Sequence, residues 1–295
     1  MQFSLIVATL GRTFELNRLL ESLDNQTHRD FEIIIVDQNP DQRLLPIIEN
    51  HSNRMTIRHL TGEPGVSRAR NLGIRAATGS IVCFPDDDCW YRADLLERVS
   101  AQFGQHNDWQ CIVGEAVDEA GNPVLPWRDR AGPLTRPMSW RRSVCFAIFI
   151  RAECLARIGE FDETLGPGTG QPWGCGEDND LVLRTLEANL AVQYVETLQV
   201  FHPRIFPGYD RARIAKRYRY SLGDGRLLRK HPMPWWWMAL CFGVPLARAA
   251  LASIRLKSNE TRFHLETFRG RLGGYLSAEL GPVHPPDSLK TIERT

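Results

Sequence analysis

Apolar runs alternate with amphipathic segments in the first half of the chain. Four runs predict strands buried in a sheet, at 3–10, 31–38, 55–60 and 80–84. The segments that separate or follow them carry apolar residues at helical spacing and predict helices over 15–23, 43–51, 66–77 and 92–103. This alternation predicts an α/β fold, a parallel sheet covered by helices on both faces.

The second half is less regular and ends in a segment of different composition. It predicts strands over 110–117, 144–150 and 191–203, and helices over 151–159 and from about Glu177. The loop 126–143 is rich in Pro, Arg and Trp and has no period, which is typical of a functional loop. Because the composition shifts near 207–209, we predict an α/β domain over 1–208 and a helical C-terminal module over 209–295.

The predicted C-terminal module is basic and contains one long apolar segment. From Arg211 onward there are 16 Lys or Arg and 6 Asp or Glu, which leaves 20 basic and 29 acidic residues for the rest. Residues 233–256, "MPWWWMALCFGVPLARAALASIRL", are mostly apolar, with Arg248 inside the segment and Arg255 near its end. Their Trp trio and basic flanks predict peripheral membrane contact, with a buried helical hairpin as the alternative. Nucleic acid is a competing anion, but no nucleic-acid motif is present, so we expect no such partner.

Cysteine usage and the first residues indicate a cellular location. Seven scattered cysteines without a CxxC pair suggest reduced core thiols. The start "MQFSLIVATLGRT" has a strand pattern and lacks the features of a signal peptide. We therefore expect a cytoplasmic protein at the inner face of the cell membrane. The sequence gives no indication of the oligomeric state.

Polar side chains follow several of the predicted parallel strands. Thr9 and Arg12 follow the first strand, Asp37 ends the second, and Asp86 to Asp88 follow the fourth. Parallel sheets bind ligands at the carboxyl ends of their strands, so these residues are expected around one crevice. Adjacent carboxylates suit Mg²⁺ or Mn²⁺, especially one that also holds a diphosphate. The alternatives are an Asp-rich helix cap and a dehalogenase-type phosphatase nucleophile, which Trp90 disfavours.

Four motifs together resemble family 2 glycosyltransferases over roughly residues 3–205. They are "SLIVATLGR", "IIIVDQ", "GVSRARNLGIRAATGSIVCFPDDD" and "GCGEDNDL", in the family's order and approximate spacing. The resemblance implies the α/β GT-A fold, which is Rossmann-like and has a mixed, mostly parallel sheet with helices on both faces. It also implies inverting transfer from a nucleotide-diphospho-sugar, commonly a UDP-sugar, with Mn²⁺ or Mg²⁺ as cofactor.

The resemblance also implies roles for residues that would bind the donor. Thr9 and Arg12 would line the nucleotide pocket, Asp37 would bond the base, and Arg70 would hold the ribose-diphosphate region. A turn aspartate and a solvated helix face are the alternative interpretations of Asp37 and Arg70.

The aspartate trio matches the family's DxD motif. Asp88 would ligate the metal directly, Asp86 would lie near the ribose or a metal-bound water, and Asp87 lies between them. His202, after the last predicted strand, would be a further ligand of the metal or diphosphate. A lone histidine is also compatible with a purely structural role.

The family's Glu-Asp pair matches Glu177 and Asp178. Asp178 would be the general base that removes the proton from the acceptor hydroxyl, and Glu177 its positioning partner. Acidic residues that stabilise a helix N-terminus are the alternative. Trp173 would stack on an acceptor sugar, or else pack within its loop.

The overall prediction is a glycosyltransferase of surface polysaccharide synthesis with a glycan or lipid-linked acceptor. One rival is a non-catalytic GT-A-like membrane scaffold. The other is a sugar-nucleotide nucleotidyltransferase, which would need a Gly-rich, Lys- or Arg-bearing loop after the first strand. "TLGRTFELN" does not supply such a loop.

Overall fold

The computed structural model describes residues 1–125, 130–204 and 208–277. The chain divides into two compact units. The first unit comprises Met1–Glu163 and Glu177–Pro207, and the second comprises Thr164–Gly176 and Gly208–Thr295. The segment Thr164–Gly176, which the sequence-based boundary at 208 assigned to the α/β domain, thus belongs to the second unit.

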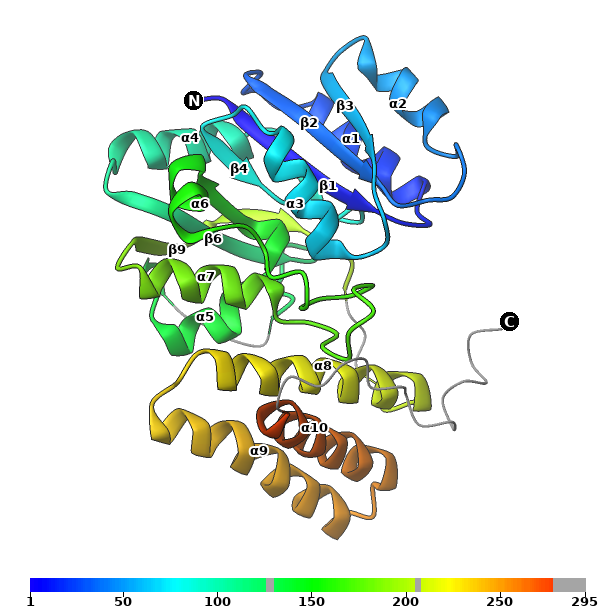
Figure 1. Cartoon of the computed structure of the whole chain (residues 1–295), viewed down its shortest axis with the longest axis vertical. Helices are drawn as coiled ribbons and strands as arrows, with labels where there is room; N and C mark the ends of the chain where they lie inside the picture. Colours follow the sequence, from blue (N-terminus) through cyan, green and yellow to red (C-terminus); the bar gives the residue numbers. More distant parts are fainter. Residues whose placement is uncertain (126–129, 205–207, 278–295) are drawn as a thin grey trace. The chain divides into compact units, whose positions relative to one another are not determined.

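A nine-stranded mixed sheet forms the centre of the first unit (Figure 1). The strand order is β3-β2-β1-β4-β8-β6-β9-β5, with β7 paired to β9. β1 pairs in parallel with β2 and β4, and its last residue Thr9 lies opposite Asp37. The strands are β1 Phe3–Thr9, β2 Phe31–Asp37, β3 Thr56–Thr61, β4 Ile81–Cys83, β5 Trp90–Tyr91, β6 Trp109–Val117, β7 Gly132–Pro133, β8 Ile148–Arg151 and β9 Ala191–Phe201.

The helices predicted for the first half of the chain are confirmed. The first unit contains α1 Phe14–Asp24, α2 Leu45–Ser52, α3 Val66–Ala76, α4 Leu95–Gln105, α5 Arg136–Arg142, α6 Ala152–Ile158 and α7 Glu177–Glu187. The strand predicted over 144–150 is only partly right, because Cys145–Ala147 forms a 3-10 turn before β8 begins. The two-residue strand β5 was not predicted, since it is too short to show a period.

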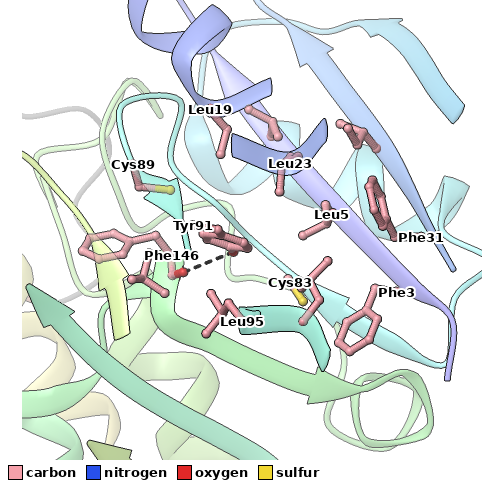
Figure 2. Close-up of a cluster of buried hydrophobic side chains, with 14 of the residues drawn as sticks. Phe3, Leu5, Leu19, Leu23, Phe31, Cys83, Cys89, Tyr91, Leu95 and Phe146 are labelled. Atoms are coloured by element: carbon pink, nitrogen blue, oxygen red, sulfur yellow. Dashed lines mark hydrogen bonds between the residues drawn. The ribbon is translucent and has the colours of Figure 1, made fainter. Parts of the chain in front are cut away.

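Apolar side chains fill both faces of the sheet. On β1, Phe3, Leu5 and Val7 pack in one cluster and Ile6 in the other, as expected for side chains that alternate between faces. The first cluster includes Leu19 and Leu23 from α1 (Figure 2). This double burial explains the continuous apolar runs of the sequence. All seven cysteines are free thiols, and six of them are buried.

Up to residue 277, where its description ends, the second unit contains three long helices, α8 Arg211–Lys230, α9 Trp235–Ile254 and α10 Ser258–Leu276. Glycines bring α8 and α10 into backbone contact. A Cβ atom at Gly225 would overlap the carbonyl oxygen of Arg271, and one at Gly274 would overlap that of Leu222. The segment Thr164–Gly176 lies on α8, where the Cys175 thiol bonds the carbonyl oxygen of Tyr220 at 3.1 Å.

Helix α9 is the candidate membrane segment. Among the described residues it is the one helix that is long and apolar enough to cross a membrane, judged by length and composition. Only Cys241, Pro245, Ala249 and Ala252 are buried among its twenty residues. Most residues of α9 are therefore not buried, in contrast to the buried helical hairpin considered as the alternative.

Candidate functional site

The carboxyl ends of β1 and β2 form one side of the candidate site. Asp37 is 2% exposed, and its Oδ1 accepts hydrogen bonds from the backbone N–H and the amide of Asn39, at 2.8 and 2.7 Å. Its Oδ2 lies 3.1 Å from Nε2 of His59. The Asn39 amide oxygen accepts a bond of 2.7 Å from the N–H of Gly11. The carboxylate is therefore fixed in place, and its role in binding the base stays a prediction.

Sequence reasoning missed the two partners of Asp37. Asn39 carried a signal, because an Asx turn is common where Asp or Asn follows a strand. His59 carried none, since it lies 22 residues away along the chain, on β3.

The next group at this edge of the sheet is the aspartate trio, Asp86 to Asp88, which follows β4. The guanidinium of Arg12 lies 2.5 Å from Oδ1 of Asp87 and 2.7 Å from Oδ2 of Asp88. Burial raises the pKa of Asp87, although Arg12 opposes that rise. Burial alone would also raise the pKa of Asp88, but the hydrogen bond and charge of His202, together with Arg12, lower it. Opposite charges thus reduce the repulsion between the adjacent carboxylates of the trio.

Asp86, Asp88 and His202 form a cluster suited to a metal ion. One ligand atom from each lies within 4.8 Å of the others. Nδ1 of His202 donates to the carbonyl oxygen of Pro203 at 2.8 Å, which leaves Nε2 to ligate. The ring also stacks on Phe146, with centroids 4.9 Å apart. Two carboxylates and an oriented imidazole fit Mn²⁺ and Mg²⁺, and they are the three residues predicted as metal ligands.

Arg70 links the aspartate trio to the predicted base. It lies on α3 and is 4% exposed. Its guanidinium contacts Oδ1 of Asp86 at 3.0 Å and Oε1 of Glu177 at 3.3 Å, and lies 5.4 Å from the centre of the Phe161 ring. The sequence predicted Arg70 near the diphosphate but missed these bridges. A direct contact with the donor stays a prediction.

Glu177 and Asp178 open α7 directly after Gly176, whose φ of 108° favours glycine. Glu177 is 7% exposed, and its Oε2 is buried without a hydrogen-bond partner in the described part of the chain. Burial, followed by the charge of Glu177, raises the pKa of Asp178 to about 8. A carboxylate with a raised pKa suits a general base. The Asn179 amide also donates to the carbonyl oxygen of Ser139, which links α7 to α5.

Trp173 belongs to the second unit and is 5% exposed. Its ring lies beneath the guanidinium of Arg226, 5.7 Å from the ring centre. The indole is thus buried against a residue of α8. Stacking on an acceptor sugar stays a prediction and would require the indole to become uncovered.

Solved structures share the architecture of this chain. S. aureus TarS residues 1–349, in complex with UDP-GlcNAc, matches with a TM-score of 0.61 at 17% identity, over 91% of this chain and 92% of that one. The mannosyltransferase PcManGT from Pyrobaculum calidifontis, in complex with GDP-Man and Mn²⁺, gives a TM-score of 0.62 at 15% identity, over 93% and 87%. The fold is that of the GT-A glycosyltransferases, as predicted.

Sequence relatives complete the identification. Residues 4–150 match the family model described as Glycosyl transferase family 2. A PGL/p-HBAD biosynthesis glycosyltransferase of Mycobacterium bovis (strain BCG / Pasteur 1173P2) is 33% identical over 166 residues. The match covers 54% of this chain and 63% of that relative, less than two thirds of its length. The chain belongs to glycosyltransferase family 2.

Proposed function

We propose that the protein transfers a sugar, with inversion, from a nucleotide-diphospho-sugar to an acceptor hydroxyl. A UDP-sugar is the proposed donor, and Mn²⁺ or Mg²⁺ the proposed cofactor. One observation carries the proposal. The buried Arg70 contacts both Asp86 of the potential metal cluster and Glu177, whose neighbour Asp178 has a raised pKa. The site thus combines the two functions that an inverting transferase needs.

The proposed mechanism assigns each carboxylate a separate task. Asp178 removes the proton from the acceptor hydroxyl as that oxygen attacks the anomeric carbon, opposite the departing nucleotide diphosphate. Glu177 and Arg70 position the base, and Asp37 accepts a hydrogen bond from the nucleotide base. Thr9, Arg12 and Asp87 line the donor pocket. Asp86, Asp88 and His202 would hold the metal, which when bound supplies positive charge that stabilises the leaving diphosphate.

The acceptor proposal is a glycan or a lipid-linked glycan of surface polysaccharide synthesis. Support comes from the apolar, largely exposed helix α9 and from the name of the Mycobacterium bovis relative, which is a glycosyltransferase of PGL/p-HBAD biosynthesis. We propose that the protein works at the inner face of the cell membrane. Contact through 233–256 would hold the enzyme close to such an acceptor.

The donor is tested by thermal shift with a panel of nucleotide-sugars, each with and without Mn²⁺. A ligand that binds the folded state raises its apparent stability by mass action, by about 2.7 kcal/mol at a hundredfold excess over Kd. We expect a UDP-sugar to raise the melting temperature more with Mn²⁺ than without it. If no nucleotide-sugar shifts the transition, the scaffold alternative replaces the enzyme.

The chemistry is tested with isosteric variants of the two key aspartates. D88N and D178N should each reduce donor hydrolysis or transfer at least a hundredfold, because each removes a charge required at the site. D88N should also lose the Mn²⁺-dependent thermal shift, whereas D178N should keep it. The matched control is D41N, since Asp41 is exposed and pairs with Arg43. Full activity of D178N would exclude Asp178 as the base.

A further inference from the structure

Seven large apolar residues of α9 are exposed, and five of them form a stripe along one side of the helix. The other two, Trp235 and Leu246, lie outside this stripe. The stripe consists of Trp236, Leu240, Val244, Leu251 and Ile254, which are between 38% and 80% exposed. At about 100° per residue, these positions fall within an arc of about 80°. The buried residues of the helix occupy the opposite side. Such a stripe is characteristic of a helix that lies at a membrane interface.

The stripe ends at the corner between α9 and α10. There Leu256 is 91% exposed and has a φ of 54°, in the left-handed region that branched and bulky side chains rarely adopt. The residue therefore carries two separate costs, an apolar side chain in water and a backbone conformation that its side chain disfavours. Ile254, two residues earlier, is 80% exposed. Apolar side chains held in solvent in this way indicate a contact surface.

A basic groove of about 450 Å³ adjoins Leu256. Its polar lining includes three cations and three hydroxyl groups, from Lys257, Arg262, Arg269, Ser253, Ser258 and Thr261. Lys257 pairs with Glu260 at 3.3 Å, and Arg269 pairs with Glu266, another lining residue, at 2.9 Å. Arg262 is exposed and has no ion-pair partner in the described part of the chain. The groove therefore offers a free guanidinium and hydroxyl donors directly beside an apolar corner.

We propose that this corner binds the phosphate headgroup of an anionic membrane lipid. Arg262 and Lys257 contact the phosphate, and the hydroxyls of Ser258 and Thr261 donate hydrogen bonds to it. Leu256 and Ile254 enter the acyl layer, in continuation of the α9 stripe. A membrane lipid explains the groove and the exposed leucine together, whereas a soluble phosphate would leave Leu256 in water. The inference deepens the proposed membrane contact and does not depend on sugar transfer.

The test is co-sedimentation of the full chain with vesicles of phosphatidylcholine alone or with about 30% phosphatidylglycerol, at several salt concentrations. Wild type should bind the anionic vesicles and lose affinity as salt increases. Each basic residue near a charged surface contributes about fivefold, so K257Q/R262Q should bind about 30-fold more weakly. The matched control R211Q/K216Q removes the same charge from exposed positions of α8, and its affinity for the vesicles should fall less than threefold.

A second variant tests the apolar half of the corner. L256N should weaken vesicle binding about tenfold, since it removes one inserted side chain. Asparagine tolerates the left-handed backbone, so the fold should be retained, as measured by circular dichroism.

Several outcomes would overturn the proposal. Wild type could bind neutral vesicles as tightly as anionic ones, or R211Q/K216Q could lose as much vesicle affinity as K257Q/R262Q. The protein could also bind inorganic phosphate without binding vesicles. A dimer that L256N dissociates would instead assign the corner to a second copy of the chain. D178N separates this proposal from the transferase proposal, because it should lose transfer and still bind vesicles. K257Q/R262Q should likewise retain the thermal shift with the donor.

Discussion

Replacement of Arg70 by methionine tests whether the buried arginine supports the site. Met fills much of the arginine's volume but leaves Asp86 and Glu177 without their common counterion. Removal of one partner from a buried ion pair costs about 3–5 kcal/mol. The side chain of Glu177 is 10% exposed, but that of Asp86 is 35% exposed and retains part of its hydration. We therefore expect a loss near the lower limit, about 3 kcal/mol of unfolding free energy.

Urea unfolding at neutral pH, without metal, measures this loss by circular dichroism. R70M/E177Q should recover about 1–2 kcal/mol, because one uncompensated charge is removed with the arginine. The matched control is R43M. Arg43 forms an ion pair with Asp41 in which the two side chains are 41% and 50% exposed, so its loss should leave the free energy of unfolding nearly unchanged. An R70M loss no larger than that of R43M would refute the reasoning.

Three further predictions concern the base, the glycine contact and a second buried pair. Since the pKa of Asp178 is raised to about 8, kcat/KM should fall about tenfold for each pH unit below that value. E177Q removes a neighbouring negative charge, so the pH at which kcat/KM begins to fall should be lower in this variant. An unchanged pH profile would contradict the assignment. G274A should destabilise the second unit by about 1–3 kcal/mol in thermal unfolding, because its Cβ would overlap a carbonyl oxygen of α8. The control G243A, with nothing near its Cβ, should stabilise by about 0.5–1 kcal/mol. R142M should lower the free energy of unfolding in urea by about 3–5 kcal/mol, since Arg142 is 1% exposed and pairs with Glu115 at 2.9 Å. A loss below about 1 kcal/mol would contradict this prediction.

The position of the site could be predicted from the sequence because it depends on strand order. Thr9 and Asp37 end neighbouring parallel strands, and the aspartate trio follows β4, which pairs with β1. Polar residues after such strands share one edge of the sheet whatever their loops do. His202 follows the last long strand by the same logic, and the structure brings it to within 3.4 Å of Asp88.

The partners within the site could not be predicted, because they depend on side chains that meet across long separations. Arg70 and Glu177 are 107 residues apart, and helical periodicity gives only the face of α3 on which Arg70 lies. The close contact of α8 with α10 did carry a signal. Gly270 and Gly274 have the spacing of a small-residue helix contact, a pattern known from packed membrane helices.

The path of the chain between the two units has a practical consequence. The chain leaves the first unit after Glu163, contributes Thr164–Gly176 to the second unit, and returns at Glu177, beside the proposed base. A truncation at residue 208 would therefore remove α8 from beneath this inserted segment. Trp173 would lose the cover of Arg226, and the Cys175 thiol would lose its hydrogen-bond acceptor. The C-terminal helices are thus not a detachable tail, and domain swaps or truncated variants must keep them with the first unit.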